Sequence, residues 1–185
     1  MTELKEIIRG CVCGDNSCYE TIYNMFYPTV YGVCSRYSTT NEEMEDFIQE
    51  SFVKIFNNID KFDSKTEIVN LKFGGWAKTI SRNFCIDQVR KFKPTICEDY
   101  QTSKLSDEIE TEYNDLEYDE SYIIKAMTKL SPRYKTVFNM FYFDGLSHKQ
   151  IADKLSIKEG ASKANLYCAK KRLKNILTEN NGLDY

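Results

Sequence analysis

The chain has 185 residues and a formal net charge of −3, with 42% hydrophobic and 29% charged residues. This composition supports packed cores and argues against global disorder, and no stretch reaches the ~18 uninterrupted apolar residues of a membrane span. A chain of this length predicts two small domains. Because the N-terminus lacks the apolar core of a signal peptide, we expect the protein to be cytoplasmic with no direct membrane insertion. Seven cysteines, an odd number, then predict reduced thiols rather than a disulfide framework.

The first predicted element is a helix over residues 18–37, because apolar residues recur there every three or four positions. Within it, Pro28 predicts a kink or the first turn of a second helix. The next predicted helix is amphipathic and ends near Asn58. Its apolar stripe consists of Ile48, Phe52, Ile55 and Ile59, and its other side carries Asp46, Glu50, Val53, Lys54 and Asn57.

A polar connector, DSKTEIVNLKFGG, follows at residues 63–75 and leads into a third predicted helix over about residues 76–91. Side chains that step by four and three positions share one face of this helix: Trp76, Ile80, Asn83, Asp87 and Arg90. Pro94 closes the segment, since proline cannot continue a helix.

The charge of the chain is unevenly distributed. Residues 98–120 hold ten acidic residues against Lys104 alone, a net charge of −9, so the rest of the chain carries +6. Apolar residues are sparse in this strip and show no period, which predicts a linker over residues 95–117 and a helix from near Tyr118. Basic surfaces are therefore expected on both sides of an acidic segment.

The C-terminal part contains three predicted helices joined by short turns. Ser131–Pro132 predicts an N-cap followed by proline at the first helical position, and Asp144–Gly145 predicts the turn that ends this helix. Ser147 and Gln150 fit a capping box that opens a short second helix. With a last helix over about residues 161–177, the three form a helix-turn-helix unit.

The last helix is basic, with a net charge of +4 between residues 159 and 176. In a helix-turn-helix, the first turns of the last helix face base edges in the major groove and its later basic residues contact phosphates. Leu166, Ala169 and Leu173 would face the core. The predicted DNA-binding residues are Ser162, Lys163, Asn165, Lys170, Lys171 and Arg172. The alternative is a solvated helix whose lysines only keep the protein soluble.

Three blocks occur in a specific order: EDFIQESFVKIFNNIDKF at residues 45–62, FGGWAKTISRNFCIDQVRK at 73–91, and the helix-turn-helix at 130–173. Together they resemble the extracytoplasmic-function (ECF) sigma factors, the small two-domain initiation factors of bacterial RNA polymerase. The resemblance implies an all-α fold, with the helical bundle of sigma domain two over 1–94 and the helix-turn-helix of sigma domain four over 118–185. Domain two would read and melt the minus-ten promoter element, and domain four would read the minus-thirty-five element.

The resemblance also implies which residues act. The outer face of the second predicted helix would dock on the clamp helices of the polymerase beta-prime subunit, through Asp46, Gln49, Glu50, Val53 and Lys54. The connector and the third helix would bind unstacked bases and the DNA backbone near minus ten. The candidates there are Lys72, Trp76, Lys78, Arg82, Asn83, Asp87 and Arg90. The alternatives are a solvated helix face and, for Trp76, a place in the core.

The expected partners are the bacterial core polymerase, including its beta subunit, promoter DNA and an anti-sigma factor. No cofactor or metal is expected, because Cys11, Cys13 and Cys18 lack a fourth zinc ligand and the only histidine, His148, lies in the helix-turn-helix. No phosphate-binding glycine loop or nucleophile motif occurs, so we expect a protein that is not an enzyme.

Two other functions remain open from the sequence. A dimeric helix-turn-helix regulator would bind a palindromic operator without being part of polymerase. A helical interaction module would bind acidic proteins and no DNA. Asn165 and Cys168 stand where the sigma family commonly has arginines, so the family's base preferences do not carry over to these positions.

Overall fold

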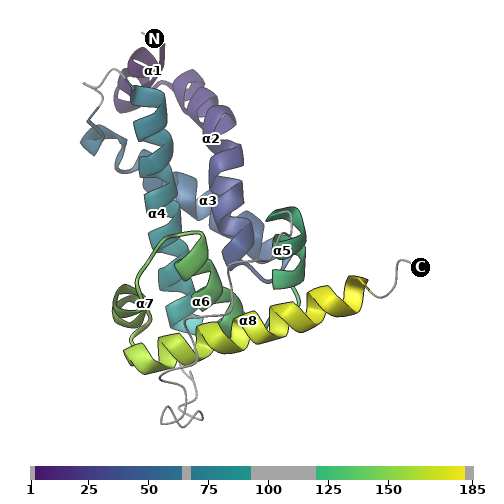
Figure 1. Cartoon of the computed structure of the whole chain (residues 1–185). Helices are drawn as coiled ribbons and strands as arrows, with labels where there is room; N and C mark the ends of the chain where they lie inside the picture. The colour runs from purple at the N-terminus through teal and green to yellow at the C-terminus, as the bar shows by residue number, and fades with distance from the viewer. Residues whose placement is uncertain (1–2, 64–67, 93–119, 182–185) are drawn as a thin grey trace. The chain divides into compact units, whose positions relative to one another are not determined.

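The computed structural model describes residues 3–63, 68–92 and 120–181, and these form helices and short turns with no strand among them (Figure 1). The expected all-α class is confirmed. In chain order the elements are α1 (Glu3–Val12), α2 (Asn16–Tyr37), α3 (Asn41–Phe56), the short 3-10 helix η1 (Ile59–Lys61), α4 (Val69–Phe92), α5 (Glu120–Met127), α6 (Pro132–Tyr142), α7 (His148–Leu155) and α8 (Glu159–Asn181).

The chain divides into two compact units, Met1–Gln88 and Val89–Tyr185. In the first unit, side chains such as Ile22 and Phe73 are fully buried, and in the second Val137 and Ile151 are fully buried. Two helical domains were expected, and this organisation is confirmed. The predicted acidic linker over residues 95–117 lies outside the described residues, so its bounds stay a prediction.

Side-chain caps define where α2 and α3 begin. Asp15 accepts a hydrogen bond from the backbone N–H of Ser17 at 2.9 Å, and Thr40 accepts one from the backbone N–H of Glu43 at 3.1 Å. Such caps satisfy donors that the first helical turn leaves unpaired. α2 continues through the exposed Pro28, so the predicted alternative of a second helix starting there is wrong.

The core of the first unit forms where α2, α3 and α4 meet. The predicted apolar stripe is confirmed as buried: Ile48, Phe52, Ile55 and Ile59. Phe26 of α2 packs on Phe73 of α4 with ring centroids 4.6 Å apart, and Phe47 of α3 meets Phe84 of α4 edge-on at 5.6 Å. Such tilted and edge-on ring pairs add to the energy of apolar burial.

α4 begins at Val69, so the predicted connector over residues 63–75 is wrong from that residue onward. Val69 and Phe73 lie one turn apart and are buried, which ties the first turns of α4 to the core. Gly74 and Gly75 lie inside α4, although glycine is a poor helix former. Tertiary packing outweighs that propensity here, since most helical stability in proteins comes from burying an apolar face.

In the second unit, α5, α6 and α7 all pack against α8. The capping box is confirmed: the Gln150 backbone N–H donates to Ser147 Oγ at 3.3 Å, and the Ser147 backbone N–H donates to Gln150 Oε1 at 2.9 Å. Gly145 has φ 65, a left-handed conformation that glycine adopts without steric cost, in the turn between α6 and α7. Ser131 precedes α6 as predicted, but its side chain makes no capping hydrogen bond.

Candidate nucleic-acid interface

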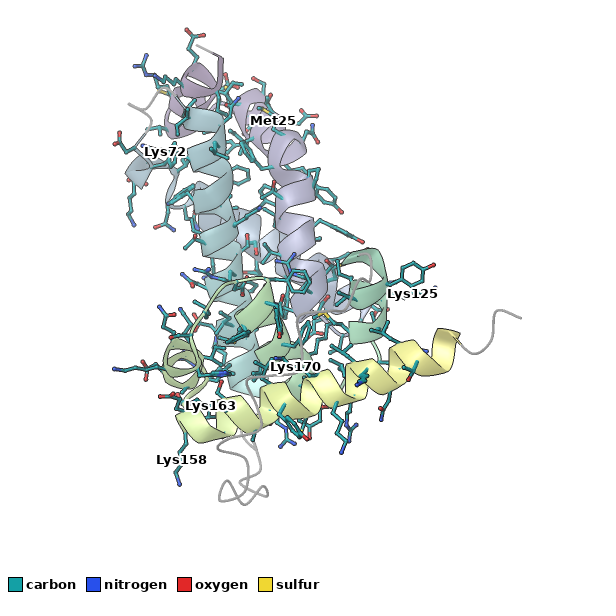
Figure 2. The ribbon with its side chains drawn as sticks, viewed as in Figure 1. Met25, Lys72, Lys125, Lys158, Lys163 and Lys170 are labelled. Atoms are coloured by element: carbon teal, nitrogen blue, oxygen red, sulfur yellow. The ribbon has the colours of Figure 1, made fainter. Side chains whose placement is uncertain are left out.

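The helix-turn-helix consists of α6, α7 and α8, and a buried apolar stripe sets the rotation of α8 about its axis. Leu166, Ala169 and Leu173 face the core as predicted, with at most 4% of each residue exposed. Lys163 and the pair Lys171–Arg172 therefore lie on exposed faces of the helix. Figure 2 shows Lys158 and Lys163 at the end of α8 that is next to α7, with Lys170 farther along the helix.

Lys163 is held by an ion pair in the first turns of α8. Its Nζ lies 3.3 Å from Glu159 Oε1, one helical turn earlier, and the two side chains are 52% and 50% exposed. A pair in such a solvated position is weak, because water screens it and both side chains lose freedom. Lys163 can therefore leave Glu159 for a base edge or a phosphate at little cost.

Aromatic rings of α6 hold two other basic residues of α8. Lys170 Nζ lies 5.4 Å from the centroid of the Tyr142 ring, and the Arg172 guanidinium carbon lies 5.2 Å from that of Tyr134. A cation over an aromatic face gains energy from the ring quadrupole. The sequence did not predict this role of Tyr134 and Tyr142, because spacing within one helix does not reveal contacts made by another helix.

Ser162 and Asn165 were predicted to face DNA, and the structure corrects both. Ser162 is fully buried and its Oγ lies 3.0 Å from His148 Nδ1, while Asn165 is 7% exposed. Ser162 precedes Leu166 by four residues and therefore continues the buried stripe of α8. The prediction followed from the stripe of Leu166, Ala169 and Leu173, which leaves Ser162 and Asn165 for DNA, although the four-residue spacing of Ser162 from Leu166 itself indicates an internal position.

The outer face of α3 carries the predicted polymerase-binding residues. All five are exposed and lie away from the buried stripe: Asp46, Gln49, Glu50, Val53 and Lys54. Val53 is 50% exposed, an apolar side chain among charged neighbours, and Lys54 Nζ lies 5.5 Å from the centroid of the Phe84 ring. The structure thus brings these residues together on one solvent-facing surface.

α4 carries the residues predicted for the minus-ten element. Five of them are exposed: Lys72, Lys78, Asn83, Asp87 and Arg90. Trp76 and Arg82 are half-buried, and the Trp76 ring packs 5.3 Å from both Phe62 and Phe73. One side of the tryptophan therefore belongs to the core. Lys72 belongs to the first turn of α4 (Figure 2).

Sequence reasoning missed two apolar side chains near the start of α4. Leu71 is 74% exposed and Ile68 is 55% exposed. Large apolar side chains at such exposure are able to contact unstacked bases. Both residues lie inside the predicted polar connector, where their apolar character is the feature of the sequence that could have identified them.

Cys11, Cys13 and Cys18 near the N-terminus are free thiols. Burial, followed by the charges of Cys18 and Asp15, raises the pKa of the Cys11 thiol to about 11. In the described parts of the chain no three His, Cys, Asp or Glu side chains are arranged to hold a metal ion.

None of the described helices combines the length and the apolar character needed to cross a membrane.

Two protein-family models match this chain. The family model Sigma-70 region 2 matches residues 22–94, and Sigma-70, region 4 matches residues 120–173. The ECF RNA polymerase sigma factor SigW of Bacillus subtilis (strain 168) is 28% identical over 189 residues, covering 95% of this chain and 97% of SigW. SigM of the same strain is 27% identical over 159 residues, covering 85% of this chain and 93% of SigM. Among solved structures, the sigma factor RpoE from Bartonella quintana, in complex with the anti-sigma factor NepR, covers 90% of this chain and 98% of its own at 19% identity and a TM-score of 0.47.

Proposed function

Because this chain belongs to the ECF RNA polymerase sigma factors, we propose that it directs the bacterial core polymerase to specific promoters and assists the melting of promoter DNA. The observation that carries this function is the presence of sigma regions 2 and 4, in that order, in a chain that relatives such as SigW match over almost its whole length. The bounds 1–94 and 118–185 for the two domains are part of the proposal.

A dimeric regulator is the less favoured function. Such a protein needs a helix-turn-helix and a dimer interface, but no region for binding polymerase. The match of residues 22–94 to sigma region 2 supports a polymerase-binding domain in that position. We therefore assign the helix-turn-helix to promoter recognition within the polymerase complex.

α8 reads the upstream promoter element in this proposal. Lys163, in the first turns of the helix, contacts a base edge in the major groove, for which guanine acceptors suit lysine best. Lys170, Lys171 and Arg172 contact the phosphate backbone, and each such contact adds about 0.9 to the slope of log affinity against log salt. The tyrosine rings over Lys170 and Arg172 reduce the freedom that these side chains lose on binding.

α4 acts at the minus-ten element. Opening a duplex requires a surface that stabilises unstacked bases, through apolar or aromatic contacts and cations on the backbone. The exposed Leu71 and half-buried Trp76 supply the first, and Lys72, Lys78 and Arg90 supply the second. Asn83 and the half-buried Arg82 lie farther along the helix, where they contact the displaced strand.

α3 binds the clamp helices of the beta-prime subunit through its outer face. The exposed Val53 provides an apolar anchor, and Asp46 and Glu50 provide the charges that orient the contact. The beta subunit is the second contact on the core enzyme. An anti-sigma factor binds the free protein and withholds it from polymerase. The chain acts in the cytoplasm and is not an enzyme, since the polymerase supplies the nucleotide chemistry.

The experiment that tests the proposal is transcription in vitro with sigma-free bacterial core polymerase and fragments of the source genome. We expect new start sites only when the protein is added, each preceded by two spaced elements that are shared among the promoters. Absence of new starts, together with binding of the free protein to DNA as a symmetric dimer, would replace the proposal by the regulator function.

A further inference from the structure

The only histidine of the chain lies where the three helices of the helix-turn-helix meet. His148 is the first residue of α7, its Nδ1 lies 3.0 Å from Ser162 Oγ of α8, and its ring stacks on Phe141 of α6 with centroids 4.9 Å apart. The stacking and the hydrogen bond together fix the position of the imidazole. Ser162 is next to Lys163 in the chain, so the ring is attached to the turn of α8 that carries the proposed base contact.

The surroundings of His148 disfavour the charged form of its imidazole in the free protein. Burial is the main cause that lowers its pKa, the cation of Lys163 is the next, and Lys170 adds a smaller effect in the same direction. Glu159 acts in the opposite direction, and Phe141, the contact from α6, is uncharged. Lys149, the next residue of α7, adds a further cation close to the start of that helix.

Duplex DNA would reverse this electrostatic balance. When Lys163 and Lys170 contact the DNA, phosphate groups neutralise the two cations that disfavour a charged imidazole and add negative charge near the ring. The second ring nitrogen, Nε2, has no hydrogen-bond partner among the described residues, and the residue is half-buried rather than sealed. A proton on the imidazole would therefore be stabilised in the DNA complex but not in the free protein.

Resting on the proposed function, we propose that His148 is a positioning residue that takes up a proton when α8 binds the upstream promoter element. The imidazole sets the first turn of α8 through Ser162 and, once charged, adds one positive charge beside Lys163 at the DNA surface. Promoter binding then strengthens as the pH falls.

The linkage between proton binding and DNA binding determines the direction in which promoter affinity changes with pH. A group whose pKa is higher in the complex than in the free protein binds a proton together with the DNA, so affinity rises as the pH falls between the two values. One such group changes affinity by at most about tenfold per pH unit. The lower end of this pH range lies below the ordinary histidine value of 6.5, because the pKa of His148 is lowered from that value in the free protein.

The test uses a promoter identified by the in vitro transcription experiment. It measures the affinity of the reconstituted polymerase complex for this promoter between about pH 5.5 and 7.5. For the wild type we expect binding to strengthen several-fold toward the lower pH. His148→Asn keeps a polar partner for Ser162 but cannot titrate. A promoter without the upstream element gives the pH dependence of binding that does not involve α8, and the affinity of each protein is corrected for it. After this correction, the affinity of His148→Asn for the promoter should not change with pH. Lys149→Gln is the matched control, because it removes a neighbouring charge, weakens binding at every pH and retains the slope.

Equal pH profiles for the wild type and His148→Asn would overturn the inference, as would a slope that Lys149→Gln removes. Failure of the wild type to form a promoter complex at any pH would instead refute the proposed function itself. A second measurement needs no variant: the one histidine gives a single set of ring-proton resonances in the full-length chain. Its titration midpoint should move to higher pH when a duplex with the upstream element is added in excess, and an unchanged midpoint in bound protein would contradict the inference.

Discussion

Removing the negative charge of Glu159 should strengthen promoter binding. In the free protein Lys163 Nζ lies 3.3 Å from Glu159 Oε1, with both side chains about half exposed. Exposed pairs of this kind contribute about 0.2–1 kcal/mol, and Lys163 must give up that energy to reach DNA. Glu159→Gln removes this competition, so we expect promoter affinity to increase by up to about fivefold, since 1.4 kcal/mol corresponds to a factor of ten.

Removing the other partner of the pair by Lys163→Ala should weaken promoter binding by about 1–3 kcal/mol, because the lysine contacts a base edge in the proposed function. The loss should be concentrated at promoters that carry the preferred base at one upstream position, while binding to core polymerase is unchanged. Competitive binding of the polymerase complex to a promoter and to a variant promoter with that base replaced measures both effects.

A double-mutant cycle separates the two contributions of Glu159. In the Lys163→Ala background, Glu159→Gln can no longer release a lysine, so its gain should shrink by the energy of the pair, about 0.2–1 kcal/mol. An identical gain in both backgrounds would show that Glu159 acts only through its charge near phosphate, and the argument from the 3.3 Å pair would be refuted.

Three further predictions concern other parts of the chain. Reversing the charges of Asp46 and Glu50 to lysine should impair binding to core polymerase while the melting temperature stays the same, because both side chains are exposed; normal assembly would show that this face is only solvated. Gly75→Ala should stabilise the first unit by about 1 kcal/mol, seen as a higher melting temperature, because the glycine lies inside α4 and an added Cβ meets no atom within 4 Å. A thiol reagent should modify the exposed Cys13 rapidly and the fully buried Cys34 only on unfolding; rapid reaction of Cys34 in the native protein would contradict the described core.

Local signals in the sequence sufficed to predict the start of α7 and the apolar stripe of α8. The capping box at Ser147 and Gln150 and the turn at Gly145 act through atoms a few residues apart, so their effect can be read without knowing the rest of the fold. The stripe of Leu166, Ala169 and Leu173 is likewise a property of one helix. These features fixed α7 and the orientation of α8 correctly.

The errors arose where a distant contact decided the outcome. α4 begins before Gly74 because Phe73 packs on Phe26, which is remote in the chain, and glycine propensity could not predict that contact. Ser162 turns inward because His148 supplies a hydrogen-bond partner, so a polar residue can occupy a buried stripe. Likewise, the rings that hold Lys170 and Arg172 belong to α6. The exposed faces of α3 and α4 could be located from periodicity, but their partners could not.

The charges of α8 also explain why one domain is not enough for promoter binding. Five basic residues lie between positions 159 and 176, and contact of all five with phosphate would give a salt slope of only about 4 to 5. Binding of that kind is largely independent of sequence and competes with about a million or more other genomic sites. A second contact by α4, joined to the first through the same polymerase, raises the effective concentration of each domain at its own element. In the proposed function, the outer face of α3 therefore contributes to promoter affinity together with α8, because the polymerase that it would bind allows both elements to be read together.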